Sequence, residues 1–417
     1  MRKLLWASLA VMVSLVSCED KDQGVEILDS GKQKEKLETI ANSLMAELSA
    51  SEVEDVVKNL SSLHNSLIST IDSETYDLSQ IYDQIEQRED DIYDYEETTP
   101  YDITETWMLL FSHVKGHVTL GPTAATYEDA NNSRVTYTDE KGVVWDMELT
   151  PVGAEKTVYL GEIVTTGIFI DSQTGAESVE YEYKTRVTVG VPEQLVVSLK
   201  RNGADYVTMT YTFDVAISSG GVNVNRDKVS IGCSINFANY NLTVNKTAFN
   251  ASTGKLEASS VLTKGGKLIV SEKVSAEVEG IDTEEPNARN IEVEVDIMGA
   301  MQIKGACANL MSIVEIFQES RPQSAKDWER IVNNVNTKFN INVYYDGGNA
   351  VQSKMNLEPR WEDDDYYWAE FALEFSDGSR YLFDEYFGGK EFEGVFNNFE
   401  LFIEDYEELF ERYFDFL

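Results

Sequence analysis

The chain has 417 residues, and 74 Asp and Glu against 34 Lys and Arg give it a formal net charge of −40. Recognition of nucleic acid needs clustered Lys and Arg for the phosphates, so this charge argues against a nucleic-acid partner. It also opposes binding to anionic lipid headgroups. With 42% hydrophobic residues the chain can bury a sizeable core, which excludes disorder throughout. Three His and three Cys leave little material for a zinc or haem site.

The first residues have the pattern of an export signal. Arg2 and Lys3 precede a mostly apolar run, residues 4–16, and the run breaks at Ser17. A helix of this length spans about 20 Å, which is too short to cross a bilayer. The pattern therefore predicts a signal peptide over residues 1–17.

The tetrapeptide Leu15-Val16-Ser17-Cys18 resembles the lipobox of bacterial lipoproteins, in which a small residue precedes the modified cysteine. The resemblance implies cleavage between Ser17 and Cys18, diacylglycerol on the Cys18 sulfur, and a further acyl chain such as palmitate on the new amine. Two or more acyl chains anchor a protein stably in a membrane. We therefore expect the chain to be held at a membrane through Cys18.

The residues after this cysteine, Glu19-Asp20-Lys21-Asp22, resemble the surface-export signal of lipoproteins from Bacteroidota. They depart from its commonest form, in which a Ser or similar spacer precedes three consecutive acids. The resemblance implies a lipid-anchored protein of the outer membrane, displayed at the cell surface. A merely solvated tether is the alternative.

Residues 18–31 are polar and predict a flexible tether. Residues 32–98 form a predicted helical region, because apolar residues from Leu37 to Ile71 recur at spacings of three and four. A third, weaker helix is predicted around residues 78–85. The dense acidic run that follows, which ends at Pro100, predicts a boundary.

Residues 99–304 predict an antiparallel β domain. Apolar and polar residues alternate over 207–217, 229–237 and 291–297, and turn signals such as Asn202-Gly203 and Gly265-Gly266 separate the runs. Short connections favour antiparallel neighbours. We expect about ten to twelve strands, several of about 10–14 residues, which is longer than usual.

Residues 305–417 predict a C-terminal α+β region. The pattern becomes helical from Gly305, strands follow at 341–345 and 366–375, and residues 395–417 predict a terminal amphipathic helix with a broad aromatic face. The predicted fold class is α+β, with a helical N-terminal segment, a large meander-like antiparallel sheet, and C-terminal helices with a small β part.

Few residues suggest catalysis or metal binding. His113 and His117 have the i, i+4 spacing of a helical metal site, but the local sequence favours a strand, in which they would lie about 13 Å apart. Cys233 is predicted on the apolar face of a strand and Cys307 at the start of a helix. They could form a disulfide in an exported protein, or remain two isolated buried cysteines. We predict no catalytic residue, no metal and no cofactor.

The most unusual feature is an acidic and aromatic stretch near the C-terminus. Trp361, Tyr366, Tyr367 and Trp368 surround three consecutive acids, Asp363-Asp364-Asp365. Exposed Trp and Tyr can stack on sugar rings, so these four aromatics are candidate ligand contacts. The acids could also offer oxygens to Ca²⁺, although no EF-hand loop is present. The alternative is a solvated acidic face over buried aromatic side chains.

Three functional classes follow from these patterns. The first is a non-catalytic binding or structural module for a glycan or a partner protein. The second is a carrier of a lipid or another apolar ligand in a curved β-sheet. The third is a hydrolase that uses two carboxylates, although 74 acids make any chosen pair uninformative. We favour the first class.

Overall fold

The structure is a computed structural model in which the chain forms two compact units. The first unit comprises Met1–Asn59 and Ala238–Leu417, and the second comprises Leu60–Phe237. Residues 27–405 are described, except 49, 73–92, 98–101, 111–114, 122–124, 131, 171–176, 217–227, 251–252, 281–286, 363–365, 389–391, 396, 399 and 402. The predicted signal peptide, most of the predicted tether and the third predicted helix lie outside the described residues.

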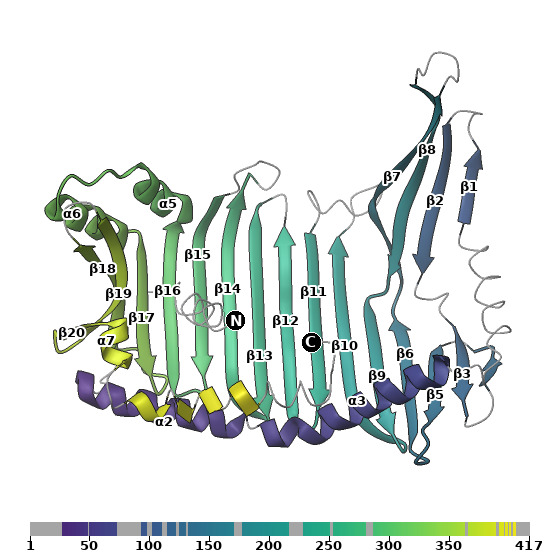
Figure 1. Cartoon of the computed structure of the whole chain (residues 1–417), viewed down its shortest axis with the longest axis horizontal. Coiled ribbons are helices and arrows are strands. Elements are labelled where there is room, and N and C mark those ends of the chain that lie inside the picture. Colours follow the sequence, from purple (N-terminus) through teal and green to yellow (C-terminus); the bar gives the residue numbers. More distant parts are fainter. Residues whose placement is uncertain are drawn as a thin grey trace. The chain divides into compact units, whose positions relative to one another are not determined.

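The first unit contains an antiparallel meander in which β12 to β20 are paired in chain order. Figure 1 shows β12 to β17 side by side. The strand bounds are β12 Tyr240–Asn250, β13 Lys255–Lys264, β14 Lys267–Glu279, β15 Asn287–Ile297, β16 Met301–Asn309, β17 Phe339–Tyr345, β18 Ser353–Glu362, β19 Tyr366–Phe375 and β20 Arg380–Leu382.

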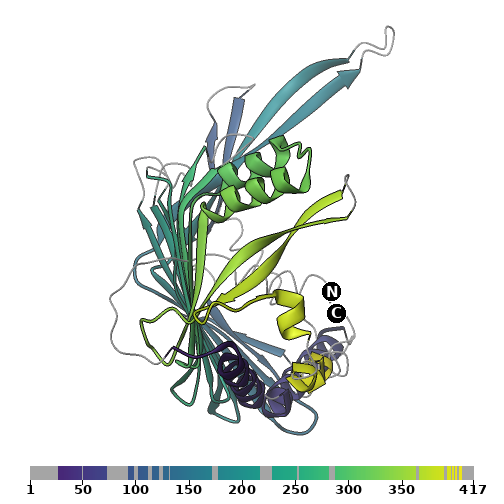
Figure 2. The ribbon, with the colours of Figure 1, turned by 90° about the vertical axis from the view of Figure 1, so that its left-hand side faces the viewer.

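Alternation along these strands creates one apolar face. Val295 lies opposite Ile303, which lies opposite Val343, so their side chains share a face of the sheet. Met355, Leu373 and Phe375 from β18 and β19 join the same core cluster as Val295, Ile303 and Ile341. Figure 2 shows the β18–β19 hairpin and the helices α5 (Leu310–Glu319) and α6 (Ala325–Asn336) on the same side of the sheet.

Helices cover this apolar face in the first unit. α2 (Ser30–Glu47) contributes Leu37, Ala41 and Met45 to the core, and α5 (Leu310–Glu319) contributes Ile313 to a neighbouring cluster. Three of the helices begin where a polar side chain accepts a backbone N–H: Asp29 for α2, Asn309 for α5 and Ser324 for α6. The other helices are α3 Ala50–Asp72, α6 Ala325–Asn336 and α7 Phe383–Phe387.

Hydrogen bonds fasten the start of α2 to the loop before β18. The backbone N–H of Leu28 donates to Oε1 of Gln352 at 2.9 Å, and Nε2 of the buried Gln33 donates to the Gln352 carbonyl at 2.8 Å. The Tyr386 hydroxyl donates to the carbonyl of Ser30 at 3.0 Å. The entry of the chain into α2 is therefore tied to elements more than 300 residues away in sequence.

A second fastening joins α2 and α3 to the β13–β14 turn. Lys264 Nζ donates to the carbonyl of Glu47 at 2.9 Å and pairs with the Glu52 carboxylate at 2.5 Å. Tyr240 donates to the same carbonyl at 2.8 Å. Hydrogen bonds from Lys264 and Tyr240 hold the pKa of Glu52 below its usual value, and the pairing raises the pKa of Lys264.

The second unit contains two groups of paired strands. In the larger group, β11 pairs with β10, β10 with β9, β9 with β6, β6 with β5, β5 with β3, and β3 with β4. Its strand bounds are β3 Gly116–Leu120, β4 Ala125–Glu128, β5 Ser133–Thr138, β6 Val144–Val152, β9 Gln194–Arg201, β10 Ala204–Ala216 and β11 Lys228–Phe237. Leu63 and Leu67 from α3 pack against its buried Leu120, Tyr137 and Trp145.

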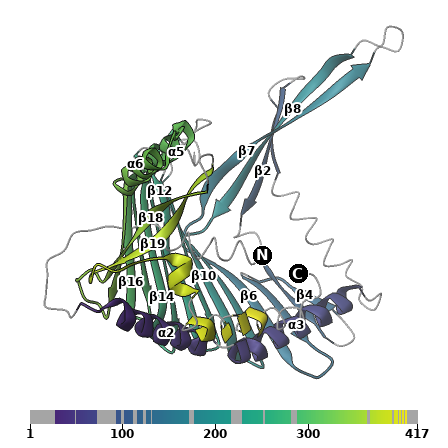
Figure 3. The same cartoon turned by 60° about the vertical axis from the view of Figure 1, so that its left-hand side comes forward.

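The smaller group of the second unit has four strands in the order β1-β2-β8-β7. Figure 3 shows β2, β7 and β8 as long neighbouring ribbons. The bounds are β1 Tyr93–Glu97, β2 Asp102–Leu110, β7 Lys156–Ile170 and β8 Glu177–Val191. Among the helices in the described part of the chain, none combines the length and apolar character needed to span a bilayer.

The α+β class and the large antiparallel sheet are confirmed, with several differences in detail. Fourteen described strands, β2 to β15, lie where ten to twelve were expected, and the pairs β3–β5 and β2–β8 are parallel. The acidic run predicted as a boundary contains β1, which pairs with β2. Pairing with β2 gives these acidic residues a strand conformation, which their charge pattern alone did not predict.

The predicted start of the C-terminal helices at Gly305 is wrong. β16 continues to Asn309, because Gly305 lies opposite Val293 and Ile341 within the sheet. Cys307 therefore lies within a strand instead of opening a helix. The described residues between 392 and 405 are helical, as expected for the terminal helix, and residues 406–417 lie outside the described part.

Candidate functional site

The four candidate aromatic residues gather at one end of the β18–β19 hairpin. Trp361 lies opposite Tyr367, Arg360 opposite Trp368, and Glu362 opposite Tyr366. Because neighbouring residues of a strand point to opposite faces, Trp361 and Tyr367 share one face of the hairpin. Tyr366 and Trp368 lie on the other face. The hairpin end therefore carries aromatic side chains on both of its faces.

Two of these aromatic side chains are exposed. Trp361 is 43% exposed and Tyr366 is 63% exposed, whereas Tyr367 and Trp368 are half-buried. Tyr367 packs on the buried ring of Trp328 from α6, with 6.1 Å between centroids. The Trp328 indole donates to the Trp368 carbonyl at 2.7 Å. Buried packing thus fixes β19, which carries Tyr366 and pairs with β18, the strand of Trp361.

A pocket of about 440 Å³ adjoins Trp361. Arg380 from β20 lines it together with two polar residues of α6 and four residues of β18: Glu329, Asn333, Glu358, Pro359, Arg360 and Trp361. Glu329 and Asn333 lie one helical turn apart on α6, beside the stripe of Trp328, Val332 and Val335 that the helix buries. The buried stripe turns these two polar side chains toward the pocket.

Ion pairs order the charged side chains of this pocket. Nε of Arg360 lies 3.3 Å from the carboxylate of Glu370, which also accepts the Trp368 indole N–H at 2.8 Å. Arg380 pairs with Glu358 at 2.7 Å. Both arginines are therefore held in place by carboxylates, that of Glu370 on β19 and that of Glu358 on β18.

The edge of β18 that faces α6 has an unusual partner. Near its start, β18 pairs with β17 through Lys354 and Ser353. Further along, the Asn336 side chain accepts the Leu357 N–H and donates to the Leu357 carbonyl, each at 2.8 Å. In a strand, the N–H and C=O groups of every second residue point to the same edge. The backbone groups of Pro359 and Trp361 therefore point to the same edge of β18 as those of Leu357. Pro359 has no N–H to leave unpaired.

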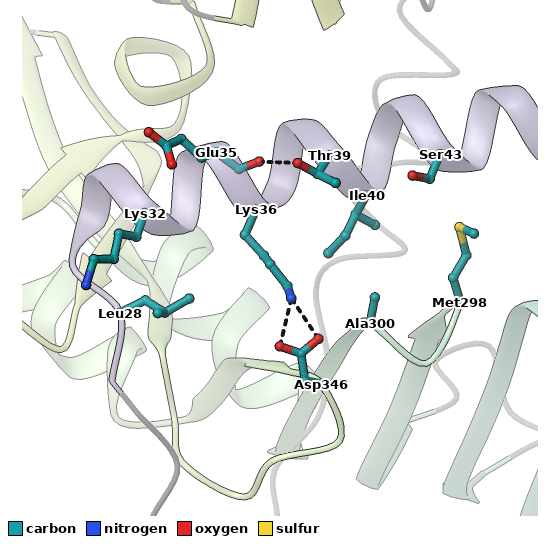
Figure 4. A pocket seen from close by; sticks show the side chains of 10 residues that line it. All are labelled: Leu28, Lys32, Glu35, Lys36, Thr39, Ile40, Ser43, Met298, Ala300 and Asp346. Atoms are coloured by element: carbon teal, nitrogen blue, oxygen red, sulfur yellow. Dashed lines mark hydrogen bonds and ion pairs between the residues drawn. The ribbon is translucent and has the colours of Figure 1, made fainter.

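A second pocket, of about 520 Å³, lies between α2 and two hairpin turns (Figure 4). Lys36 reaches from α2 to the carboxylate of Asp346, with both oxygens at 2.7 Å. Met298 and Ala300 line the pocket from the β15–β16 turn. This pocket has no aromatic side chain among its lining residues, so it offers no ring face on which a ligand could stack.

The remaining candidate residues form no comparable site. Nε2 of His117 contacts Asn132 at 2.8 Å, and His113 lies outside the described residues. Among the residues that are described, no three His, Cys, Asp or Glu side chains are arranged to hold a metal ion. Cys233 and Cys307 are free thiols, and burial raises the pKa of each. Cys18 and the acids 363–365 also lie outside the described part.

Comparison of the chain with protein-family models, with curated proteins and with solved structures finds no match.

Replacing Asn336 with Ala is expected to destabilise the first unit. The substitution leaves the half-buried Leu357 N–H and carbonyl without their partner, which should lower the free energy of unfolding by about 1–3 kcal/mol. Denaturant unfolding followed by circular dichroism measures this change. Asn334→Ala, on an exposed position of the same helix, should change it by less than about 0.5 kcal/mol. Equal effects of the two substitutions would contradict the role of Asn336.

Proposed function

We propose that the protein is a lipid-anchored outer-membrane protein, displayed at the cell surface, that binds a glycan in the Trp361 pocket without catalysis. The observation that carries the binding proposal is an exposed Trp361 beside ordered polar side chains in a pocket of about 440 Å³. This volume lies within the range of about 300–1,000 Å³ that is usual for small-molecule sites.

The chemistry of the pocket suits a sugar. The C–H groups on one face of a pyranose ring carry partial positive charge, and the face of an indole ring carries partial negative charge. Trp361 can therefore stack on the sugar face. Asn333 and Glu329 offer hydrogen-bond acceptors, and Asn333 and Arg360 offer donors, to hydroxyl groups at the ring edge.

The strand edge in this pocket favours a glycan over an extended peptide. A peptide that adds to a sheet edge needs a continuous row of backbone donors and acceptors. Asn336 already occupies the groups of Leu357, and Pro359 supplies no donor. The edge therefore offers only isolated groups, such as the carbonyl of Pro359, which a sugar hydroxyl can use.

The pairing of the carboxylates supports binding rather than hydrolysis. Glycoside hydrolysis needs one carboxylic acid that donates a proton and one carboxylate that acts as a base or nucleophile. Glu358 is paired with Arg380, and Glu370 with Arg360 and the Trp368 indole. Both carboxylates are therefore engaged by partners within the protein instead of being presented to a glycosidic bond.

Support for the membrane anchor comes from the N-terminal residues. Cys18 follows a small residue and an apolar run that begins with two basic residues, and acids follow it directly. Acyl chains on Cys18 would hold the chain at the outer membrane through a tether of about ten residues before Leu28, which can reach about 35 Å. The −40 charge would keep the rest of the chain away from anionic headgroups.

Replacing Trp361 with Ala is expected to weaken glycan binding by at least about tenfold, because the stacking surface is lost. The measurement is a glycan array on the chain without residues 1–18, followed by titration calorimetry with the glycan that binds best. Trp361→Phe keeps an aromatic face and should retain most of the affinity. Unchanged binding by Trp361→Ala would place the glycan elsewhere.

Replacing Cys18 with Ala is expected to abolish lipid attachment. The full chain, expressed in a Gram-negative host fed an alkyne analogue of palmitate, should carry the label and sediment with outer membranes. The Cys18→Ala chain should do neither, and Cys233→Ala should behave as the unmodified chain does. A labelled Cys18→Ala chain would rule out this anchor.

A second candidate function, transport of an apolar ligand, is favoured by the second unit. Residues opposite one another on β6, β9, β10 and β11 make one face of the sheet largely apolar, with Arg201 opposite Trp145 on the same face. The apolar residues of this face are Met147, Leu149, Pro151, Leu195, Val197, Leu199, Val207, Met209, Tyr211, Phe213, Val215, Val229, Ile231, Cys233, Ile235 and Phe237. Met147 is 44% exposed and Ile231 is 43% exposed. Contiguous apolar surface of this kind is uncommon unless it serves an interaction.

Native mass spectrometry tests this second candidate. After incubation with a bacterial lipid extract, the chain without residues 1–18 should carry a discrete added mass of several hundred daltons. Ile231→Asp should lose that mass, whereas Thr212→Asp, at an exposed position on the other face of β10, should keep it. A chain that stays free of added mass would rule out the carrier function.

A further inference from the structure

The arginines of the Trp361 pocket are already neutralised. Nε of Arg360 contacts the Glu370 carboxylate at 3.3 Å, and Arg380 contacts Glu358 at 2.7 Å. An arginine that recognises a carboxylate on a ligand normally presents its planar fork to both oxygens. Here one nitrogen of each guanidinium, Nε of Arg360 and Nη2 of Arg380, already contacts a carboxylate within the protein. An anionic ligand would have to compete with these internal partners.

The charges around the pocket also oppose an anion. The charges of the four charged lining residues, Glu329, Glu358, Arg360 and Arg380, cancel. Glu370, in contact with Arg360, leaves one negative charge in excess. Glu362, which follows Trp361 on β18, adds a further negative charge beside the pocket. The chain as a whole carries −40, so the long-range field repels anions as well.

Hydroxyl groups meet no such competition. A guanidinium carries five N–H donors, and the recorded contact of Arg360 with Glu370 engages Nε. The remaining donors can bond to the lone pairs of sugar hydroxyls while the ion pair stays intact. The carboxylate of Glu329 and the amide of Asn333 are exposed and can accept from hydroxyls.

We infer that the pocket selects uncharged glycans and rejects glycans that carry carboxylates or sulfates. This inference rests on the proposed glycan-binding function and names the class of glycan. The paired arginines serve as fixed donors for hydroxyls, and the excess of acids around them sets the selectivity.

The test compares neutral and acidic oligosaccharides of equal length on the chain without residues 1–18. The probes are laminarihexaose, cellohexaose, mannohexaose and maltohexaose as neutral sugars, and hexagalacturonate and a hyaluronan hexasaccharide as acidic ones. Titration calorimetry is expected to show binding of at least one neutral hexasaccharide, at least about tenfold tighter than either acidic one. Binding of the neutral sugar should change little between about 50 and 500 mM salt.

A charge variant tests the stated cause. Glu370→Gln keeps a side-chain oxygen for the Trp368 indole and removes the charge that neutralises Arg360. We expect it to narrow the difference in affinity between hexagalacturonate and the neutral sugar by about three- to tenfold, mainly by tightening the binding of hexagalacturonate. Glu277→Gln on β14 removes the same charge away from the pocket lining and should change neither affinity. An unchanged hexagalacturonate affinity in Glu370→Gln would overturn the stated cause of selectivity.

Two further outcomes separate the inference from the function beneath it. If an acidic hexasaccharide binds as tightly as the neutral ones and Trp361→Ala abolishes that binding, the selectivity is wrong and glycan binding stands. If no hexasaccharide of either kind binds, the proposed function and the inference both fail.

Discussion

The alternation of apolar and polar residues along the strands is the constraint on which both units depend. It gives the meander of the first unit and the larger strand group of the second unit one apolar face each, and water must be kept from that face for the sheet to be stable. In the first unit α2, α5 and the β18–β19 hairpin cover it, and this requirement brings the N-terminal helix and the C-terminal hairpin into one core. In the second unit α3 packs against part of the sheet, while Met147 and Ile231 stay exposed.

The position of the Trp361 pocket is a consequence of how the β18–β19 hairpin packs into this core. The face of β18–β19 that joins the core holds Met355 and Leu373, and toward the hairpin end the same face carries Tyr367 against Trp328. Trp361 lies beyond this packed region and is therefore exposed. Glu370 holds both Arg360 and the Trp368 indole, so little side-chain freedom remains to be lost when a ligand binds.

Sequence reasoning reached the α+β class and singled out the aromatic stretch 361–368 because both depend on local patterns, whereas the pairing of β18 with β19 was not predicted. Alternation over 207–215 and 291–297 is visible in a single strand, and Trp361 to Trp368 are adjacent in the chain.

The error at Gly305 arose because a glycine in a strand looks like a break until its partners Val293 and Ile341 are known. Parallel pairs such as β3–β5 likewise depend on which strands meet. The pocket residues Glu329, Asn333 and Arg380 come from other elements. Only the i, i+4 spacing of Glu329 and Asn333 on one helix could have pointed to the first two.

The attachment of the α2 start to Gln352 has a mechanical consequence. A force applied through the residues before Leu28 would act first on the hydrogen bonds that join Leu28 and Gln33 to Gln352 and Tyr386 to Ser30. The bonds to Gln352 lie directly before β18. The sheet would therefore bear part of the force before α2 could separate from it. At the far end of α2, Lys264 would resist the same movement by holding Glu47. Because α2 is hydrogen-bonded to other elements of the first unit at both of its ends, it would transmit a force from its N-terminal side into the sheet.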